Sequence, residues 1–406
     1  MPDGSSPPPL VLHCPTLTSV GGGKRAIRAR IELGGRDFTL YYTFEGEVPE
    51  ARADALLSAT LLAAMASGSP VESEAGVSSR LLDQVPSIEE IYAAWVPRLR
   101  PVPVTADRVP SAGPRGGRGA SFFTAGLDSY YTLLSHDAEI DAIIFVHGFA
   151  SPVQGPARER TSKTLQRVAR DLGKRLVEVE TNLAALFDEW LGPGPNYVAV
   201  PPHRLSNFEL AHGAALASVA HLLPDSIGRV YIAAGHNYDR FYAWGSHPSL
   251  DPKWSSDRVE FRHDGAGATR VEKARLVGRH RLALETLRVC PGATDTGSNC
   301  GRCEKCIRTM VNLRIAGALQ PCAVFAEPLD LRRVALIRTP AFKPFLRQNL
   351  VEARDLGTDP ELVAALQRAV HPWRPGRIAL EVGLVGWKAM KRLLPVEYSG
   401  RRIRWR

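Results

Sequence analysis

The sequence predicts an α/β protein, a doubly wound parallel sheet covered by helices on both faces. In residues 120–287, short apolar runs of strand length alternate with longer segments of helical periodicity. The strand-like runs, such as Asp141–Val146, are almost continuously apolar, which is typical of strands buried on both faces. Parallel neighbours need a crossover connection, usually a helix, so this alternation favours a parallel sheet.

Residues 1–97 are expected to form a small α+β domain without a recognisable catalytic motif. Period-two alternation around Gly34-Gly35 predicts a hairpin, and apolar stretches predict helices, the second of which would begin after Ser87. The expected elements are Leu10–Leu12, Arg25–Leu33, Arg36–Phe44, Ala51–Ala66 and Ile88–Trp95. Residues 98–119 are rich in Pro, Gly and Arg and are predicted to be a linker.

Residues 120–320 are predicted to be the main α/β domain, and residues 325–406 a helical, basic C-terminal extension. The expected strands of the main domain are Ala120–Thr124, Asp141–Val146, Arg175–Val179 and Arg229–Ala234. Its expected helices are Ser129–Ser135, Glu159–Leu172, Ser206–Leu223 and Val271–Leu287.

The positive charge is concentrated at the C-terminus. The whole chain of 406 residues has a formal net charge of +9, and residues 371–406 contain nine Lys or Arg and two acids. In the last six residues Arg401, Arg402, Arg404 and Arg406 surround Trp405, a pattern that suits nucleic acid or an anionic surface. A packed helix followed by a solvated terminus is the simpler alternative.

No run reaches the roughly 18 apolar residues that span a bilayer, so no transmembrane segment is expected. The start, MPDGSSPPP, lacks the features of a signal peptide, and a cytoplasmic location is predicted. Four of the six cysteines lie within 17 residues, which in a reducing compartment favours a metal site over disulfides. The oligomeric state is left open, a homodimer being one option.

A candidate phosphate-binding loop joins the first strand of the main domain to its helix. It consists of Thr124, Ala125, Gly126, Leu127, Asp128 and Ser129. A strand that turns sharply into a helix points backbone N–H groups and the positive end of the helix dipole at one place, which binds anions. Asp128 is either a helix cap or a group that acts through Mg²⁺. Neither a Walker A lysine nor a dinucleotide-binding G-x-G-x-x-G pattern is present, and an ordinary strand–helix turn is the alternative.

This loop resembles the S-G-G-x-D-S pyrophosphate loop of the PP-loop ATP pyrophosphatases, a superfamily with a fold of the HUP type. Gly126, Asp128 and Ser129 match the second glycine, the aspartate and the final serine of the motif, whereas Thr124 and Ala125 replace its first two residues. The resemblance implies ATP and Mg²⁺ at the loop, with Asp128 and Ser129 in catalytic roles.

Cys290, Cys300, Cys303 and Cys306 form a C-x9-C-x2-C-x2-C pattern. Short spacings let the thiolates converge on one ion, and four thiolates suit a structural Zn²⁺. An iron–sulfur cluster is the competitor, but ferredoxin runs place a fourth cysteine after three intervening residues, where Met310 stands. The phosphate loop followed along the chain by the four-cysteine pattern resembles the arrangement in the 7-cyano-7-deazaguanine synthases (QueC-like proteins). The resemblance covers residues 118–318.

Polar residues directly after the strand Arg229–Ala234 are predicted to line a substrate or nucleotide cleft, since ligands bind beyond the carboxyl ends of parallel strands. They are Gly235, His236, Asn237, Asp239 and Arg240. Arg270 and Lys273, at a helix start, are further candidates for contacts to anionic groups. The alternatives are that the first five residues belong to a solvated loop and that Arg270 and Lys273 are ordinary surface charges.

The resemblance implies a carbon–nitrogen ligase that splits ATP into AMP and pyrophosphate. The enzyme would adenylate a carboxylate or an amide-type oxygen of a small molecule, a modified base or a peptide, and a nitrogen nucleophile would displace AMP. Sulfur transfer to tRNA or a small molecule is a second option, for which Cys14 and Cys322 are the spare cysteines. A non-enzymatic nucleotide-binding module with a basic nucleic-acid-binding tail is a third.

Overall fold

The computed structural model describes residues 7–110, 117–149, 154–191, 198–200, 203–240, 242–290, 299–337, 342–357, 359–371, 398–399 and 402–403. It divides into two compact units. The first comprises residues 1–124 and 128–267, and the second comprises residues 125–127 and 268–406. The predicted boundaries at residues 97 and 120 differ from this division.

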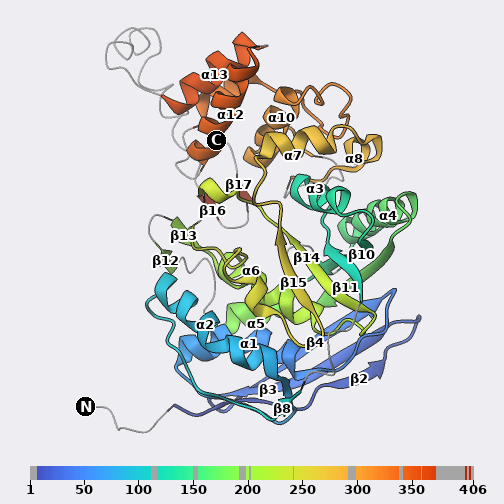
Figure 1. Cartoon of the computed structure of the whole chain (residues 1–406), viewed down its shortest axis with the longest axis vertical. Helices are drawn as coiled ribbons and strands as arrows, with labels where there is room; N and C mark the ends of the chain where they lie inside the picture. The colour runs from blue at the N-terminus through green and yellow to red at the C-terminus, as the bar shows by residue number, and fades with distance from the viewer. Residues whose placement is uncertain are drawn as a thin grey trace. The chain divides into compact units, whose positions relative to one another are not determined.

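The first unit contains an eleven-stranded sheet, in the order β15-β14-β9-β10-β11-β4-β3-β1-β5-β7 with β2 beside β3 (Figure 1). Its strands are β1 (Leu10–Leu12), β2 (Thr16–Ser19), β3 (Arg25–Leu33), β4 (Arg36–Glu45), β5 (Val71–Ser73), β7 (Val104–Thr105), β9 (Arg118–Phe122), β10 (Ile140–His147), β11 (Arg175–Thr181), β14 (Ile227–Ala233) and β15 (Glu260–Asp264). Two-stranded pairings join β6 (Val77–Ser78) to β8 (Arg108–Val109) and β12 (Val198–Val200) to β13 (His203–Leu205).

The five strands β15, β14, β9, β10 and β11 run parallel to one another, which confirms the prediction of an α/β protein with a parallel sheet. Within this parallel part of the sheet, β9 is the middle strand and comes first in the chain. The chain then adds β10 and β11 on one side of β9, and afterwards β14 and β15 on the other side. The strand order therefore reverses between β9 and β14. The antiparallel pairing of β11 with β4 extends the same sheet into the N-terminal strands.

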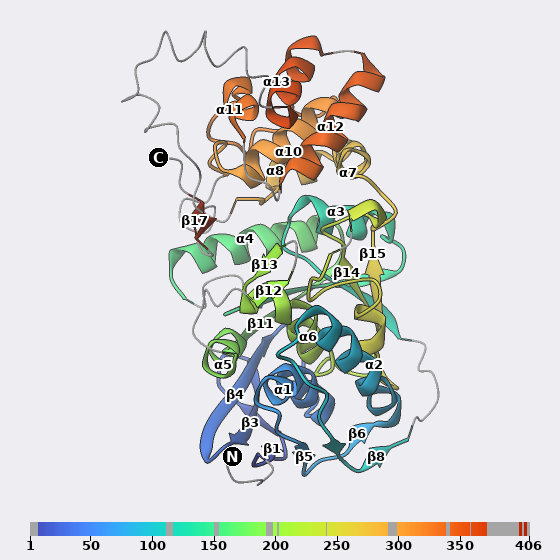
Figure 2. The same ribbon diagram turned by 90° about the vertical axis from the view of Figure 1, so that its left-hand side faces the viewer.

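Helices cover the sheet of the first unit on both faces (Figure 2). Ala142 and Ile144 of β10 face a core formed with α1 and α6, whereas His147 on the alternate face meets α4 through Glu178 and Ser162. Helix α1 is buried on nearly all sides and packs against α6. The helices are α1 (Ala53–Ser67), α2 (Ser79–Trp95), α3 (Leu127–Ser135), α4 (Pro156–Asp171), α5 (Leu183–Trp190) and α6 (Asn207–Ala220), with the short 3₁₀ turns η1 (Tyr238–Arg240) and η2 (Asp251–Trp254).

Three sequence predictions need correction. Helix α2 begins at Ser79 with Ser78 as its N-cap, nine residues before the predicted start, and it accommodates Pro86. The predicted linker contributes a strand, Val104–Thr105, which pairs with β5. The single helix predicted at Val271–Leu287 is two helices, because the chain turns at Gly278–His280.

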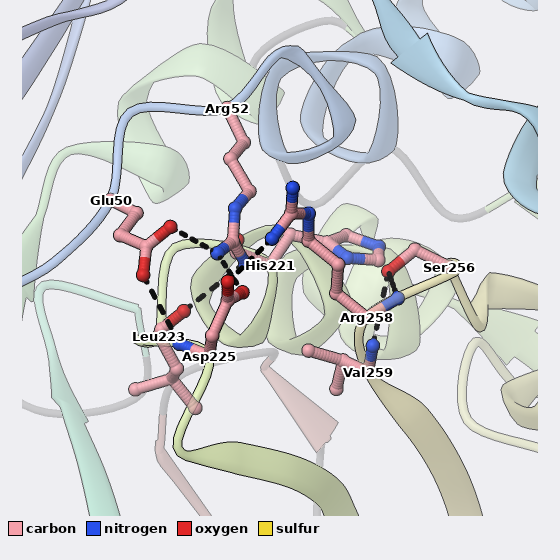
Figure 3. A network of polar contacts seen from close by, with 8 residues as sticks. All are labelled: Glu50, Arg52, His221, Leu223, Asp225, Ser256, Arg258 and Val259. Carbon is pink, nitrogen blue, oxygen red and sulfur yellow. Dashed lines mark hydrogen bonds and ion pairs between the residues drawn. The ribbon is translucent and has the colours of Figure 1, made fainter. Parts of the chain in front are cut away.

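A largely buried arginine, Arg52, ties three loops of the first unit together (Figure 3). Arg52, at the N-cap of α1, donates to the carbonyl oxygens of His221 and Leu223, both at 3.2 Å. It also pairs with Glu50 and with Asp225, the latter at 2.5 Å. Asp225 in turn accepts from Arg258, just before β15, at 2.6 Å. These contacts link the β4–α1 connection to the segment between α6 and β14 and to the residues just before β15.

The second unit is helical. Its core contains Ile307 and Val311 of α10 with apolar residues of the three following helices. Its helices are α7 (Arg270–Val277), α8 (Arg281–Thr286), α10 (Glu304–Ile315), α11 (Leu331–Leu336), α12 (Lys343–Leu356) and α13 (Pro360–Val370). Strands β16 (Tyr398–Ser399) and β17 (Arg402–Ile403) pair with each other. The remaining residues of the predicted basic tail lie outside the described residues, and the prediction about its partners stays a prediction. Over the described parts of the chain, no helix combines the length and the apolar character needed to cross a membrane.

Candidate functional site

The reversal of strand order between β9 and β14 identifies the edge of the sheet where a ligand is expected. In open α/β sheets, ligands bind outside the carboxyl ends of the strands, at the point where the order reverses. The chain leaves β9 through the candidate phosphate loop and leaves β14 through the predicted cleft segment, at the same edge of the sheet because the two strands are parallel. Two segments more than 100 residues apart are thus brought to one edge, as predicted.

The candidate phosphate loop has a strained backbone. Ala125 has a φ of 56°, and it is the only residue other than glycine with a positive φ among those described. A left-handed conformation costs a residue with a Cβ about 1–2 kcal/mol. Such strain, held by the surrounding structure, is common at functional sites. Ala125 is fully buried, so packing around its methyl group holds the turn in place.

The other residues of the loop lead directly into α3. Leu127 is the first residue of the helix, and Asp128 lies in its first turn, where a carboxylate faces the positive end of the dipole. The Thr124 N–H donates to Oγ of Ser129 at 3.3 Å, so the Ser129 hydroxyl bridges the ends of the turn. Ser129 is 5% exposed, whereas Thr124 is exposed. The arrangement is suited to binding an anion at the start of α3.

The segment after β14 divides into residues that line a cavity and residues that do not. Gly235 and His236 line a cavity of about 140 Å³. Asn237 is nearly buried and donates to Asp239 at 3.4 Å, and Asp239 itself is exposed. Arg240 ends the turn η1, and its side chain lies outside the described residues. Of the five residues that the sequence predicted to line a cleft, two line this cavity.

We call this space the histidine cavity, because four imidazole rings line it. Its lining comes from α6, the end of β14, the following loop and β15, all within the first unit. The lining residues are His212, Ala233, Gly235, His236, Tyr242, Trp244, Ser246, His247 and His263. The hydroxyl of Tyr242 is 2.9 Å from Nε2 of His236, and the rings of Tyr242 and Trp244 lie edge to face.

A buried carboxylate organises one wall of the histidine cavity. Asp251 is 0% exposed and accepts hydrogen bonds from Nδ1 of His263 and Oγ of Ser246, each at 2.7 Å. It also accepts from the backbone N–H of His247 at 3.2 Å. Burial, followed by the neighbouring His263, lowers the pKa of His247, so this ring is neutral at physiological pH.

A second histidine–carboxylate pair lies at the carboxyl end of β10. Nε2 of His147, which is fully buried, is 2.9 Å from Oε1 of Glu178 on β11, and Ser162 of α4 donates to the same oxygen. Burial opposes ionisation of Glu178, but these hydrogen bonds outweigh it and lower its pKa. This pair stabilises the packing of α4 against the sheet.

Arg270 and Lys273 belong to the second unit. Arg270 is the first residue of α7, which begins with a capping box formed by Thr269 and Glu272. Lys273 is 1% exposed, so it is a core residue of this helix rather than the surface charge that was the alternative. Their predicted role as contacts to anionic groups stays a prediction.

The four cysteines of the second unit converge as predicted. Their sulfur atoms all lie within 4.8 Å of one another. The distance from Sγ of Cys290 is 3.4 Å to that of Cys300 and 3.6 Å to that of Cys303, and Cys300 is 3.9 Å from Cys306. A tetrahedral ion with bonds of about 2.3 Å separates its sulfur ligands by about 3.8 Å. The cluster therefore has the dimensions of a four-thiolate metal site.

The backbone around the cysteines is fixed by residues that the motif does not include. The Asn299 side chain accepts from the N–H groups of Val289 and Cys290, at 2.8 and 3.1 Å, and donates to the carbonyl of Leu287 at 2.8 Å. It therefore joins the two halves of the cluster. Gly301 has a φ of 73°, and a Cβ there would lie 2.3 Å from the carbonyl oxygen of Glu327, so only glycine fits this turn.

The four cysteines could all be ionised together only around a cation. Cys306 is fully buried and Cys290 and Cys303 are each 8% exposed, so four negative charges could not coexist there alone. The hydrogen bond with Cys290 is the main reason that the pKa of Cys303 rises to about 12. A bound metal ion reverses this, because it stabilises every thiolate. The residues present fit a metal ion.

Sequence reasoning did not find Asp251, Ser246, His247 or His263 as site residues. They come from three segments without a fixed spacing, and nothing in the sequence relates Asp251 to His263. The polar character of the segment Tyr231–His247 was the one available signal. Comparison of the chain with protein-family models, curated proteins and solved structures finds no match in any of the three.

Proposed function

We propose that the chain is a PP-loop ATP pyrophosphatase of the HUP fold type that acts as a carbon–nitrogen ligase. It converts ATP to AMP and pyrophosphate, adenylates a carboxylate or an amide-type oxygen, and transfers the activated group to a nitrogen nucleophile. Activation is needed because a carboxylate is a poor electrophile, whereas in an acyl-adenylate AMP is a good leaving group.

The observation that carries this proposal is the position of the Thr124–Ser129 loop. It follows the central strand β9, where the strand order reverses, and it begins α3. Backbone N–H groups at that point suit the β- and γ-phosphates of ATP, and Asp128 suits their Mg²⁺. Ala125 holds the conformation for which the superfamily motif has glycine, which supports the residue-by-residue match.

The cysteine cluster supports the same proposal, with Zn²⁺ as the ion. A site with four protein thiolates has no open position for substrate, so the ion is structural. It would tie Cys290 to the turn that begins α10. The order of the two motifs along the chain is the order that the 7-cyano-7-deazaguanine synthase resemblance implies.

Sulfur transfer has less support than ligation. Cys322 is 7% exposed, its Sγ is 3.5 Å from the carbonyl of Leu284, and burial raises its pKa to about 11. Such a thiol is a weak nucleophile at physiological pH. Cys14, the other spare cysteine, is exposed, on the loop between β1 and β2.

The loop is tested with Asp128→Ala, a variant that removes a half-buried carboxylate. MgATP binding is measured by titration, and pyrophosphate release is measured with a panel of carboxylates and hydroxylamine as the nitrogen nucleophile. We expect pyrophosphate release to fall by about 10²–10³-fold, as for other preorganised groups at a developing charge.

The matched control is Asp137→Ala, which removes a carboxylate just after the same helix, where it pairs with Lys174. This variant should keep the parent's pyrophosphate release. Equal activity of Asp128→Ala and the parent would contradict the assignment of the loop.

A further inference from the structure

We propose that a cavity at the amino-terminal edge of the parallel strands binds a free α-amino acid, whose carboxylate pairs with Arg258 and whose ammonium group pairs with Asp54. We call this space the amino-edge cavity, because Arg258 comes just before β15, at the edge of the sheet opposite to the carboxyl ends of β14 and β15. The proposal is independent of the proposed function, which concerns the carboxyl edge.

The amino-edge cavity lies within the first unit and has a volume of about 430 Å³. This volume is typical of small-molecule sites, which measure about 300–1,000 Å³. Its wall comes from the β1–β2 loop, the start of α1, the paired strands β6 and β8, and the residues just before β15. The charged side chains of the wall are Glu50, Arg52, Asp54, Asp257 and Arg258.

Arg258 has an unoccupied side of its guanidinium group. Nη1 donates to Asp225 at 2.6 Å, which fixes the position of the group (Figure 3). Among the described residues, Nε and Nη2 have no acceptor, and the side chain is 33% exposed. These two nitrogens form a planar fork that binds a carboxylate through two parallel hydrogen bonds. Arg258 is therefore preorganised for a ligand carboxylate.

Asp54, in the first turn of α1, provides a charge of the opposite sign. It is 7% exposed, and its Oδ1 accepts from the Ser78 N–H at 3.2 Å. Within the described part of the chain, Oδ2 has no hydrogen-bond partner and is not one of the enclosed polar atoms that lack a partner. Because Asp54 lines the cavity, a ligand there can reach this oxygen. A carboxylate with so little exposure is poorly hydrated and favours a cationic partner.

Arg258 and Asp54 are close to each other but do not pair. The hydrogen bond to Asp225 is the main reason that the pKa of Arg258 is raised, and the charge of Asp54 adds to the effect. No ion pair joins the two side chains among the residues that the structure describes. Opposite charges that border one cavity without meeting suit a ligand that carries both signs on a small skeleton.

The balance of charge distinguishes this ligand from simpler ions. The arginine network of Figure 3 has two guanidinium groups and two carboxylates, so it is neutral as a whole. Asp54 and Asp257 make the remaining wall negative, which disfavours phosphate and other multiply charged anions. A simple amine would leave the fork of Arg258 without an acceptor. An α-amino acid brings the ammonium group and the carboxylate together.

The site is tested on the full chain, without ATP, by isothermal titration calorimetry with the common L-amino acids. We expect at least one of them to bind. The amino acid that binds most tightly is then compared with the corresponding carboxylic acid without the amino group, and with the corresponding amine without the carboxylate. Each analogue should bind about tenfold or more weakly, because one charge-assisted contact is lost.

Two variants locate the binding. Arg258→Gln removes the fork, and Asp54→Asn removes the charge but keeps an oxygen for the Ser78 N–H. Each should weaken binding of the same amino acid about tenfold or more. The matched control is Arg262→Gln, on β15, where the exposed arginine pairs with Glu260 and does not line the cavity. It should bind the amino acid like the parent.

Three results would overturn the proposal. The first is that no amino acid binds the parent at millimolar concentration. The second is that the acid or the amine binds as tightly as the amino acid. Both are measured on the parent chain, so neither depends on a variant that folds. The third is that a folded Arg258→Gln or Asp54→Asn keeps the parent's affinity, which would place the amino acid elsewhere.

Discussion

The cysteine cluster and the histidine cavity are both built from metal-ligating side chains, yet they are assembled in opposite ways. The four cysteines lie within 17 residues and meet through one tight turn at Gly301. The four histidines span residues 212–263 and meet only because α6, β14 and β15 pack in one unit. The first site therefore follows from local spacing, and the second follows from the topology of the sheet.

The difference also concerns what stabilises each site. A bound ion would stabilise the cysteine cluster, because its thiolates repel one another without one. The cavity is stabilised without an ion, by a buried carboxylate and by packing such as that of Trp95 on His247 at 5.3 Å. Removal of metal should consequently affect the second unit and leave the first intact.

The largest effect should come from loss of the metal. We expect about one zinc ion per purified chain, and Cys303→Ser should release it. Structural zinc contributes about 10–16 kcal/mol in zinc-finger peptides, so the second unit should lose its cooperative unfolding. Limited proteolysis should cut first around residues 288–330. Cys322→Ser, a change of another buried cysteine, should keep the zinc, and a coloured, iron-containing protein would contradict the assignment.

A smaller effect is expected from the arginine network of the first unit. Arg52→Met keeps the apolar stem but leaves two carboxylates and two carbonyl groups without their shared donor (Figure 3). Breaking a buried pair costs 3–5 kcal/mol, and because Glu50 is 42% exposed we expect about 3 kcal/mol. Denaturant unfolding measures this loss. Arg108→Met, which breaks an exposed pair with Asp83, should change stability by less than about 1 kcal/mol.

The smallest of these effects concerns pH. Burial is the main cause that lowers the pKa of His221 to about 4, below its ordinary value of 6.5. The unfolded chain therefore binds a proton between these values that the folded chain does not, so stability is lost as the pH falls through this window. Between pH 7 and pH 5 the loss should be about 2 kcal/mol. The variant His221→Gln should lack this loss of stability. If the free energy of unfolding depends on pH in the same way in the variant and in the parent, His221 is not the cause of the loss.

Much of the fold could be predicted because a strand that is buried on both faces leaves a nearly continuous apolar run in the sequence. The apolar runs at β10 and β14 and the hairpin β3–β4 were predicted to within a few residues. Strand β15, with the sequence EFRHD, was missed because it lies at the sheet edge and only Phe261 is fully buried. The start of α2 was missed because Pro86, inside a helix, is usually a sign that a helix stops there.

The residues of the candidate site likewise fall into those that the sequence could identify and those that it could not. The Thr124–Ser129 loop and the cysteines could be found, since each is a short motif whose spacing determines its geometry. Asp251 could not be related to His263, because a hydrogen bond between residues of separate segments has no sequence signature. Of the residues predicted to line a cleft, Gly235 and His236 line the histidine cavity, and their role in binding a ligand stays a prediction.

The most direct test of the account is the identity of the products formed from ATP. The parent chain is incubated with MgATP, a panel of carboxylates and hydroxylamine, and the nucleotides and phosphates are identified by ³¹P NMR. The account predicts AMP and pyrophosphate, with hydroxamate formed in equal amount. Formation of ADP and phosphate, or ATP left intact by a folded, zinc-loaded protein that does not bind MgATP, would contradict it.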